Sequence, residues 1–184
     1  MAWIGLRPGS TLIPLTERMA YLAKQPPAWS WGWGIWMLCA LALVSFMAVL
    51  QRALPGDPLA AQLALIVSAA GMAVDLLCDA LQIQVLPLAG ASQPAVFLPF
   101  ERLASIGGLT VANGLYTMGL LMMNLSLRGL VGTPARFVGW AAVVSGFSLA
   151  ASGFVSSHIL LQAATGATIT FYSLWTVLVA RDLQ

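Results

Sequence analysis

Five long apolar stretches, separated by short polar segments, constrain this chain more than any other feature. They lie at about residues 31–50, 59–86, 101–127, 137–155 and 159–179. A helix needs about 20 mostly apolar residues to cross the hydrocarbon core of a bilayer. Only 8% of the residues are charged, whereas a soluble domain carries roughly 25%. We therefore predict an all-α integral membrane protein, a bundle of about five transmembrane helices.

The first 30 residues form the longest polar segment, and we expect an N-terminal interfacial arm over 1–30 and the transmembrane bundle over 31–184. Within the arm, apolar residues recur at helical spacing; they are Leu12, Leu15, Met19 and Leu22. This spacing is typical of a short helix lying in the membrane interface. A loop that covers one end of the bundle is the alternative. The segment 87–100, which contains three prolines and a glycine, is expected to be a loop between two spans.

Four tryptophans cluster where the first span begins. They are Trp29, Trp31, Trp33 and Trp36. Tryptophan is enriched at membrane–water interfaces because its ring is apolar and its N–H is polar. We expect these four residues to be interface anchors.

Composition excludes several classes of function. The net charge is only +2, too small and too scattered for a nucleic-acid surface. A single lysine, Lys24, lies outside the spans, so a retinal Schiff base within a helix is excluded. A single histidine, His158, excludes two-histidine haem ligation within this chain. The two cysteines, Cys39 and Cys78, lie in apolar runs and are expected to pack as small hydrophobes, so no metal site is predicted.

The second span carries two acids at helical spacing. Asp75 and Asp79 are four residues apart and Gln82 follows three residues later, so all three lie on one helix face. A charge in the middle of a bilayer costs at least about 2.5–3.5 kcal/mol. The pair must therefore face protein or water, and one carboxylate needs a proton or a cation.

The third span offers partners for these acids. Arg102, Asn113 and Tyr116 fall on a common part of its circumference at the 3.6-residue period. A hairpin of the second and third spans predicts an ion pair between Arg102 and Asp79, with Asn113 nearer Asp75. Glu101 is expected at the interface, because an acid is favourable at the start of a helix.

The last two spans add weaker signals. His158 and Gln162 begin a polar stripe along the fifth span, and we include both in the candidate polar intramembrane site, with His158 at the membrane edge. In the fourth span, Ser145, Ser148 and Ser152 share one face. Small residues of this kind allow helices to approach closely, and we assign these serines to helix packing rather than to catalysis.

One motif resembles part of an enzyme signature. Gly71, Asp75 and Asp79 have the spacing G-x-x-x-D-x-x-x-D, which resembles the second half of the signature of CDP-alcohol phosphatidyltransferases. That resemblance implies metal-binding aspartates. Three positions of the signature differ here, where Leu54, Pro58 and Gln62 replace an aspartate, a glycine and an arginine. The metal would lose an oxygen ligand, and we do not assign the chain to that family.

Three functions remain open. The first is a non-catalytic subunit or scaffold of a membrane complex, with other membrane proteins or further copies of the chain as partners. The second is a small transporter or ion- and proton-handling protein, with Asp75 as the carrier. The third is an intramembrane enzyme acting on a lipid or a quinone. In each case we expect bound membrane lipid and no nucleic acid. Arginines near the span ends place the C-terminus in the cytoplasm.

Overall fold

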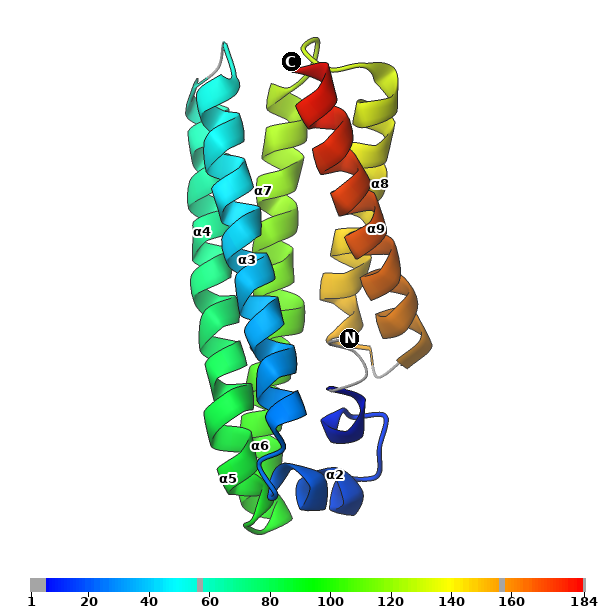
Figure 1. Cartoon of the computed structure of the whole chain (residues 1–184). Coiled ribbons are helices and arrows are strands. Elements are labelled where there is room, and N and C mark those ends of the chain that lie inside the picture. Colours follow the sequence, from blue (N-terminus) through cyan, green and yellow to red (C-terminus); the bar gives the residue numbers. More distant parts are fainter. Residues whose placement is uncertain (1–5, 56–57, 156–157, 184) are drawn as a thin grey trace. The chain divides into compact units, whose positions relative to one another are not determined.

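The computed structural model describes residues 6–55, 58–155 and 158–183, and every regular element in this part of the chain is a helix (Figure 1). Five helical stretches are long and apolar enough to cross a membrane. They are Pro27–Ala53, Leu59–Gly90, Pro94–Ser126, Thr133–Ser152 and Ile159–Asp182. The predicted fold class is confirmed, and the composition of these helices is that of an integral multi-pass membrane protein.

Two short helices precede the spans, and two spans are built from several helical segments. The N-terminal elements are η1 (Arg7–Gly9) and α2 (Leu15–Leu22), and α3 (Pro27–Ala53) is the first span. The second span joins α4 (Pro58–Ala80), the π-helical η2 (Leu81–Val85) and α5 (Leu86–Gly90). The third joins α6 (Pro94–Ser105), the π-helical η3 (Ile106–Ala112) and α7 (Asn113–Ser126). The last two are α8 (Thr133–Ser152) and α9 (His158–Asp182).

The prediction of a loop over 87–100 is wrong, because helix continues on both sides of a short turn. Pro87 lies within α5, behind a π-helical segment that accommodates its missing N–H. Pro94 occupies the first position of α6, where no intrahelical N–H bond is needed. Only residues 91–93 are left outside a helix, and both spans are longer than expected.

The chain divides into two compact units, each contributed by separate parts of the sequence. Unit 1 comprises Met1–Ala42 and Val74–Gly108. Its core contains two residues of α2, Met19 and Leu22, which pack with Leu6, Trp29, Leu86, Ala89 and Phe97. Helix α2 lies crosswise to α3 (Figure 1) and contacts α5. The arm is therefore packed onto the helices of unit 1 as a helix, and its place in the membrane interface stays a prediction.

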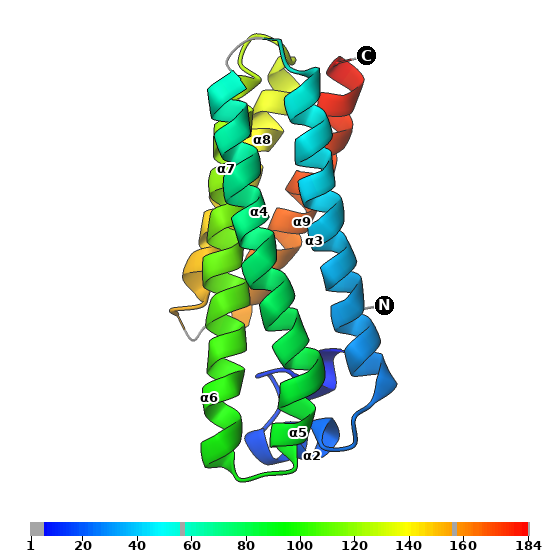
Figure 2. The same ribbon diagram turned by 90° about the vertical axis from the view of Figure 1, so that its left-hand side faces the viewer.

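Unit 2 comprises Leu43–Ala73 and Leu109–Gln184. Its core is built around Trp175 and Val179 of α9, which pack with Met47 of α3 and with Leu120 and Met123 of α7. Phe46 and Tyr172 lie edge-on to the Trp175 ring. The last residues of α3, α7 and α9 and the first residues of α4 and α8 lie at one end of this unit (Figure 2). That end brings together segments that are far apart in the sequence.

Helices α7 and α8 meet along a seven-residue repeat. On α8 the repeat is Gly139 and Gly146, continued by Gly153 at the helix end; on the other side it is Asn124, Thr117 and Thr110. Residues seven apart lie nearly above one another on a helix. A Cβ at Gly146 would collide with the hydroxyl of Thr117. Glycine thus supplies the close approach at these positions, and the helix-packing role of the α8 serines stays a prediction.

Candidate functional site

Two acids and a thiol lie together on α4 in unit 1. Asp79 and Cys78 are buried, and Asp75, one turn earlier, is half-buried. The start of η3 approaches this face through two glycines. A Cβ at Gly107 would collide with the Cys78 sulfur, and one at Gly108 would lie 3.7 Å from Oδ1 of Asp75. The Gly-Gly pair therefore allows the backbone of the third span to lie against the acidic face of the second.

Asp79 is the most deeply buried of the predicted site residues. Its exposed fraction is 2%, and its Oδ2 atom has no hydrogen-bond partner among the described residues. An isolated buried carboxylate is costly, so a proton or a cation must neutralise it. The described residues contain no group of three His, Cys, Asp or Glu side chains arranged to hold a metal ion.

The predicted ion pair between Arg102 and Asp79 is not formed. The buried face of α6 carries Phe97, Glu101 and Ala104, three and four residues apart. Because Arg102 follows Glu101 by one residue, it falls outside this face and is exposed. Glu101 was expected at the interface, but it points inward and is 7% exposed.

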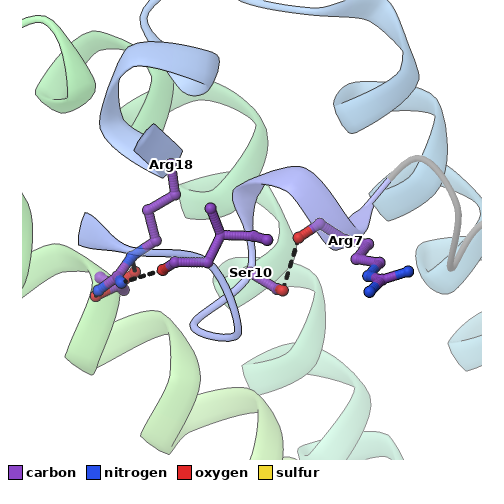
Figure 3. A network of polar contacts seen from close by, with 5 residues as sticks. Arg7, Ser10 and Arg18 are labelled. Atoms are coloured by element: carbon purple, nitrogen blue, oxygen red, sulfur yellow. Dashed lines mark hydrogen bonds and ion pairs between the residues drawn. The ribbon is translucent and has the colours of Figure 1, made fainter. Parts of the chain in front are cut away.

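Glu101 is neutralised from the N-terminal arm. Arg18 of α2 donates two hydrogen bonds of 2.7 Å to its carboxylate, from Nε to Oε1 and from Nη2 to Oε2, and a third of 2.9 Å to the carbonyl of Ile13 (Figure 3). Both side chains of the pair are nearly buried, at 12% and 10% exposed. Next to this network, the Ser10 hydroxyl donates to the carbonyl of Arg7 (Figure 3). This bidentate pair fastens α2 to α6.

The Arg18–Glu101 pair was missed from the sequence because its members are 83 residues apart. A signal did exist. Glu101 stands at the apolar spacing of Phe97 and Ala104, and an acid on a buried face requires a cationic partner. Nothing in the sequence indicated that the arm would supply it.

Trp29 is a packing residue of unit 1 rather than an exposed interface anchor. It is 2% exposed, and its indole N–H donates a 2.7 Å hydrogen bond to the carbonyl of Gln82. The π-helical turn explains this bond. The N–H of Leu86 bonds to Leu81, so the carbonyl of Gln82 faces Pro87, which has no N–H to donate. Trp29 satisfies the carbonyl that the proline leaves open.

The other three tryptophans differ from Trp29 and from one another. Trp31 is 75% exposed, and Trp33 and Trp36 are half-buried. The rings of Trp29 and Trp33 meet edge-on with centroids 5.6 Å apart. The indole nitrogen of Trp33 is buried without a partner among the described residues. A role in the membrane interface stays a prediction for Trp31, Trp33 and Trp36.

The remaining candidates belong to unit 2 or lie outside the described side chains. Tyr116 of α7 is buried, Asn113 is half-buried, and Gln162 of α9 is exposed. The acids are in unit 1, so the expected grouping of these three residues with Asp75 and Asp79 stays a prediction. Helix α9 begins at His158, but the side chain of His158 is outside the described part.

The three serines of α8 are satisfied within their own helix. Their hydroxyls donate to the carbonyls of Ala142, Val144 and Leu149 at 3.0, 2.9 and 2.6 Å, respectively. Ser145 and Ser152 are buried and Ser148 is half-buried. Hydroxyls bound in this way are self-contained polar groups within a membrane-spanning helix.

The hydrogen bond of Trp29 yields a direct prediction. Trp29→Phe leaves the Gln82 carbonyl buried and unpaired, which costs about 1–3 kcal/mol. Trp33→Phe is the matched control, since the N–H of Trp33 has no partner to lose among the described residues. Unfolding of the purified protein in detergent, followed by circular dichroism, should show a clearly larger loss for Trp29→Phe. Equal losses for the two variants would contradict the assigned role.

Comparison with known proteins gave no match to any family model, to any curated protein or to any solved structure. The resemblance to the phosphatidyltransferase signature, which also includes an aspartate at Asp57 and an alanine at Ala61, therefore rests on the sequence motif alone. Its second half is Gly71, Asp75 and Asp79. These residues lie in one uninterrupted helix, α4.

Proposed function

We propose that this protein is a non-catalytic subunit or scaffold of a membrane complex and that it binds its partner helix through the outward face of α9. The observation behind this proposal is a stripe of small and polar residues that are exposed along that face. They are Gln162, Gly166, Thr170 and Ser173. Two larger apolar residues, Ile169 and Val177, are exposed on the same face. Only 17% of the most apolar window of α9 is buried inside the protein. A partner helix would cover the polar groups that lipid cannot hydrogen-bond.

The neighbouring helix provides an internal comparison. The outward face of α8 carries Phe137, Trp140, Val144 and Phe147, all exposed, and these large apolar side chains suit contact with lipid. Against lipid alone, the amide of Gln162 would have no hydrogen-bond partner, which is costly. The contrast between two adjacent helices supports protein contact at α9 and lipid contact at α8.

Gly166 allows this proposal to be tested without disturbing the fold. A Cβ at Gly166 meets nothing within 4 Å, so Gly166→Leu leaves the isolated protein intact but obstructs a partner helix. The expected result is loss of the associated polypeptides, or of the homo-oligomer, in native mass spectrometry after gentle extraction from the membrane.

Gly34→Leu is the matched control. Gly34 lies in the spanning helix α3 and also has open space around it, so this variant should keep the assembly. Retained assembly in Gly166→Leu would contradict the proposal. Equal loss in both variants would show that α9 is not the specific contact.

A second candidate function is ion or proton handling, and the burial of Asp79 favours it. Asp79 is a better candidate for the carrier than Asp75, because it is more deeply buried and one of its oxygens has no partner among the described residues. Such a function would require an oligomer, since five spans are few for alternating access.

Asparagine substitutions test this candidate. Asp79→Asn keeps the shape of the side chain but removes its charge, so it should abolish proton or cation flux in proteoliposomes while the protein stays folded. Asp75→Asn should reduce the flux less. Normal flux in Asp79→Asn would exclude Asp79 as the carrier, and the reverse order of the two effects would transfer that role to Asp75.

We also propose that the C-terminus is cytoplasmic. Four exposed arginines gather at the end of unit 2 where the chain ends. They are Arg52, Arg128, Arg136 and Arg181. Cytoplasmic connections carry an excess of Lys and Arg. In cells, Leu130→Cys in the connection between α7 and α8 should resist a membrane-impermeant maleimide until the membrane is permeabilised. Labelling of intact cells would reverse the orientation.

A further inference from the structure

An aromatic groove runs along the outward side of α8 and α9 in unit 2. It is a shallow depression with a volume of about 400 Å³, open to the outside rather than enclosed. It is lined by Phe137, Trp140, Ala141, Val144 and Ser145 of α8 and by Phe171 of α9. Both helices have the length and composition of membrane spans. The groove is therefore open to the bilayer, and its apolar lining suits an acyl chain.

A cation lies at one end of this groove. Arg136 is in the first turn of α8, one residue before Phe137 and four residues before Trp140. Residues four apart share a helix face, so Arg136 lies one turn beyond Trp140 toward the membrane surface. Long arginine side chains at helix ends extend to the interface. Arg136 is exposed and forms no ion pair among the described residues.

Positive charge is in excess at the end of unit 2 where Arg136 lies. Among the described residues, the acid at this end of unit 2 is Asp182. The carboxylate of Asp182 is already engaged, because Arg181 donates to Oδ1 at 2.7 Å and the N–H of Gly132 donates to Oδ2 at 2.9 Å. Asp182 also occupies the N-terminal end of α8, so an additional anion would depend on Arg136 rather than on the helix terminus.

We propose that this groove binds a membrane phospholipid whose headgroup is net negative, its acyl chain lying against Trp140 and Phe171 and its phosphate, with no cationic group beside it, meeting Arg136. A guanidinium forms strong, often bidentate hydrogen bonds to phosphate. The headgroup sits at the interface and the chain lies parallel to α8, so one lipid satisfies both features. This site is separate from the α9 face of the proposed function, and its test uses the purified protein without partners.

The experiment compares two photoreactive lipids that have the same diazirine-bearing acyl chain but different headgroups, phosphatidylglycerol and phosphatidylcholine. Purified protein in neutral detergent is labelled with each lipid, and labelled residues are mapped by mass spectrometry. The expected result is labelling within residues 137–145 that is about fivefold stronger with phosphatidylglycerol, the size expected for one arginine near an anionic surface.

Three variants separate a site from a general attraction. Arg136→Gln should abolish the preference for phosphatidylglycerol. Arg128→Gln removes the same charge from the same end but away from the groove, and it should keep the preference. Ala141→Leu fills the groove and should reduce labelling of residues 137–145 by both lipids.

Several outcomes would overturn the proposal. Equal labelling by the two lipids would show that the groove does not select a net negative headgroup. Equal effects of Arg136→Gln and Arg128→Gln would show a diffuse field instead of a site. Unchanged labelling in Ala141→Leu would show that the chain lies elsewhere. Arg136 is exposed and unpaired among the described residues, so its replacement should leave the helices intact, as circular dichroism will verify.

Discussion

Unit 1 depends on the hydrogen bond from Trp29 to the carbonyl of Gln82, because this bond satisfies a buried backbone group of the second span. Inside a bilayer every backbone polar group must find its partner within the protein. Pro87 interrupts the backbone ladder of the second span, and the π-helical segment η2 absorbs the interruption but leaves one carbonyl open. The indole N–H of Trp29, which is 53 residues away in the sequence, donates a hydrogen bond to this carbonyl. The same bond ties the start of α3 to the second span and places Trp29 in the core with Leu22 and Phe97.

Two acidic side chains are buried among the described residues, Asp79 and Glu101, and they differ in whether the protein supplies a partner for each oxygen. Glu101 is nearly buried, and Arg18 neutralises its carboxylate through two short hydrogen bonds. This ion pair connects α2 to α6. Asp79 is more deeply buried than Glu101, and one of its oxygens has no partner among the described residues. A group that the fold leaves uncompensated is where a membrane protein is expected to exchange a proton or a cation.

The outward faces of α8 and α9 in unit 2 differ in composition. The exposed face of α8 is aromatic and aliphatic, and Arg136 stands at its end, which suits a lipid chain below a headgroup. The exposed face of α9 carries Gln162, Gly166 and Thr170, which suit another helix. Glycines meet the side chains of α7 on the inner side of α8, so the large residues of that helix are left for the bilayer. A partner on α9 and a lipid on α8 are compatible.

The sequence by itself determined the all-helical class and the five spans, because apolar length in a chain with few charges permits little else. It also identified Asp75 and Asp79 as neighbours on one face, which depends only on the helical period. The predictions from sequence were wrong where contacts between distant parts of the chain determine which side chains are buried. The direction in which Glu101 and Arg102 point depends on the packing of α6, and the burial of Trp29 depends on a carbonyl opened by Pro87. The sequence also did not indicate the close contacts of α8 at Gly139 and Gly146. Local periodicity fixes which residues share a helix face, but only tertiary packing decides which face is buried and what it meets.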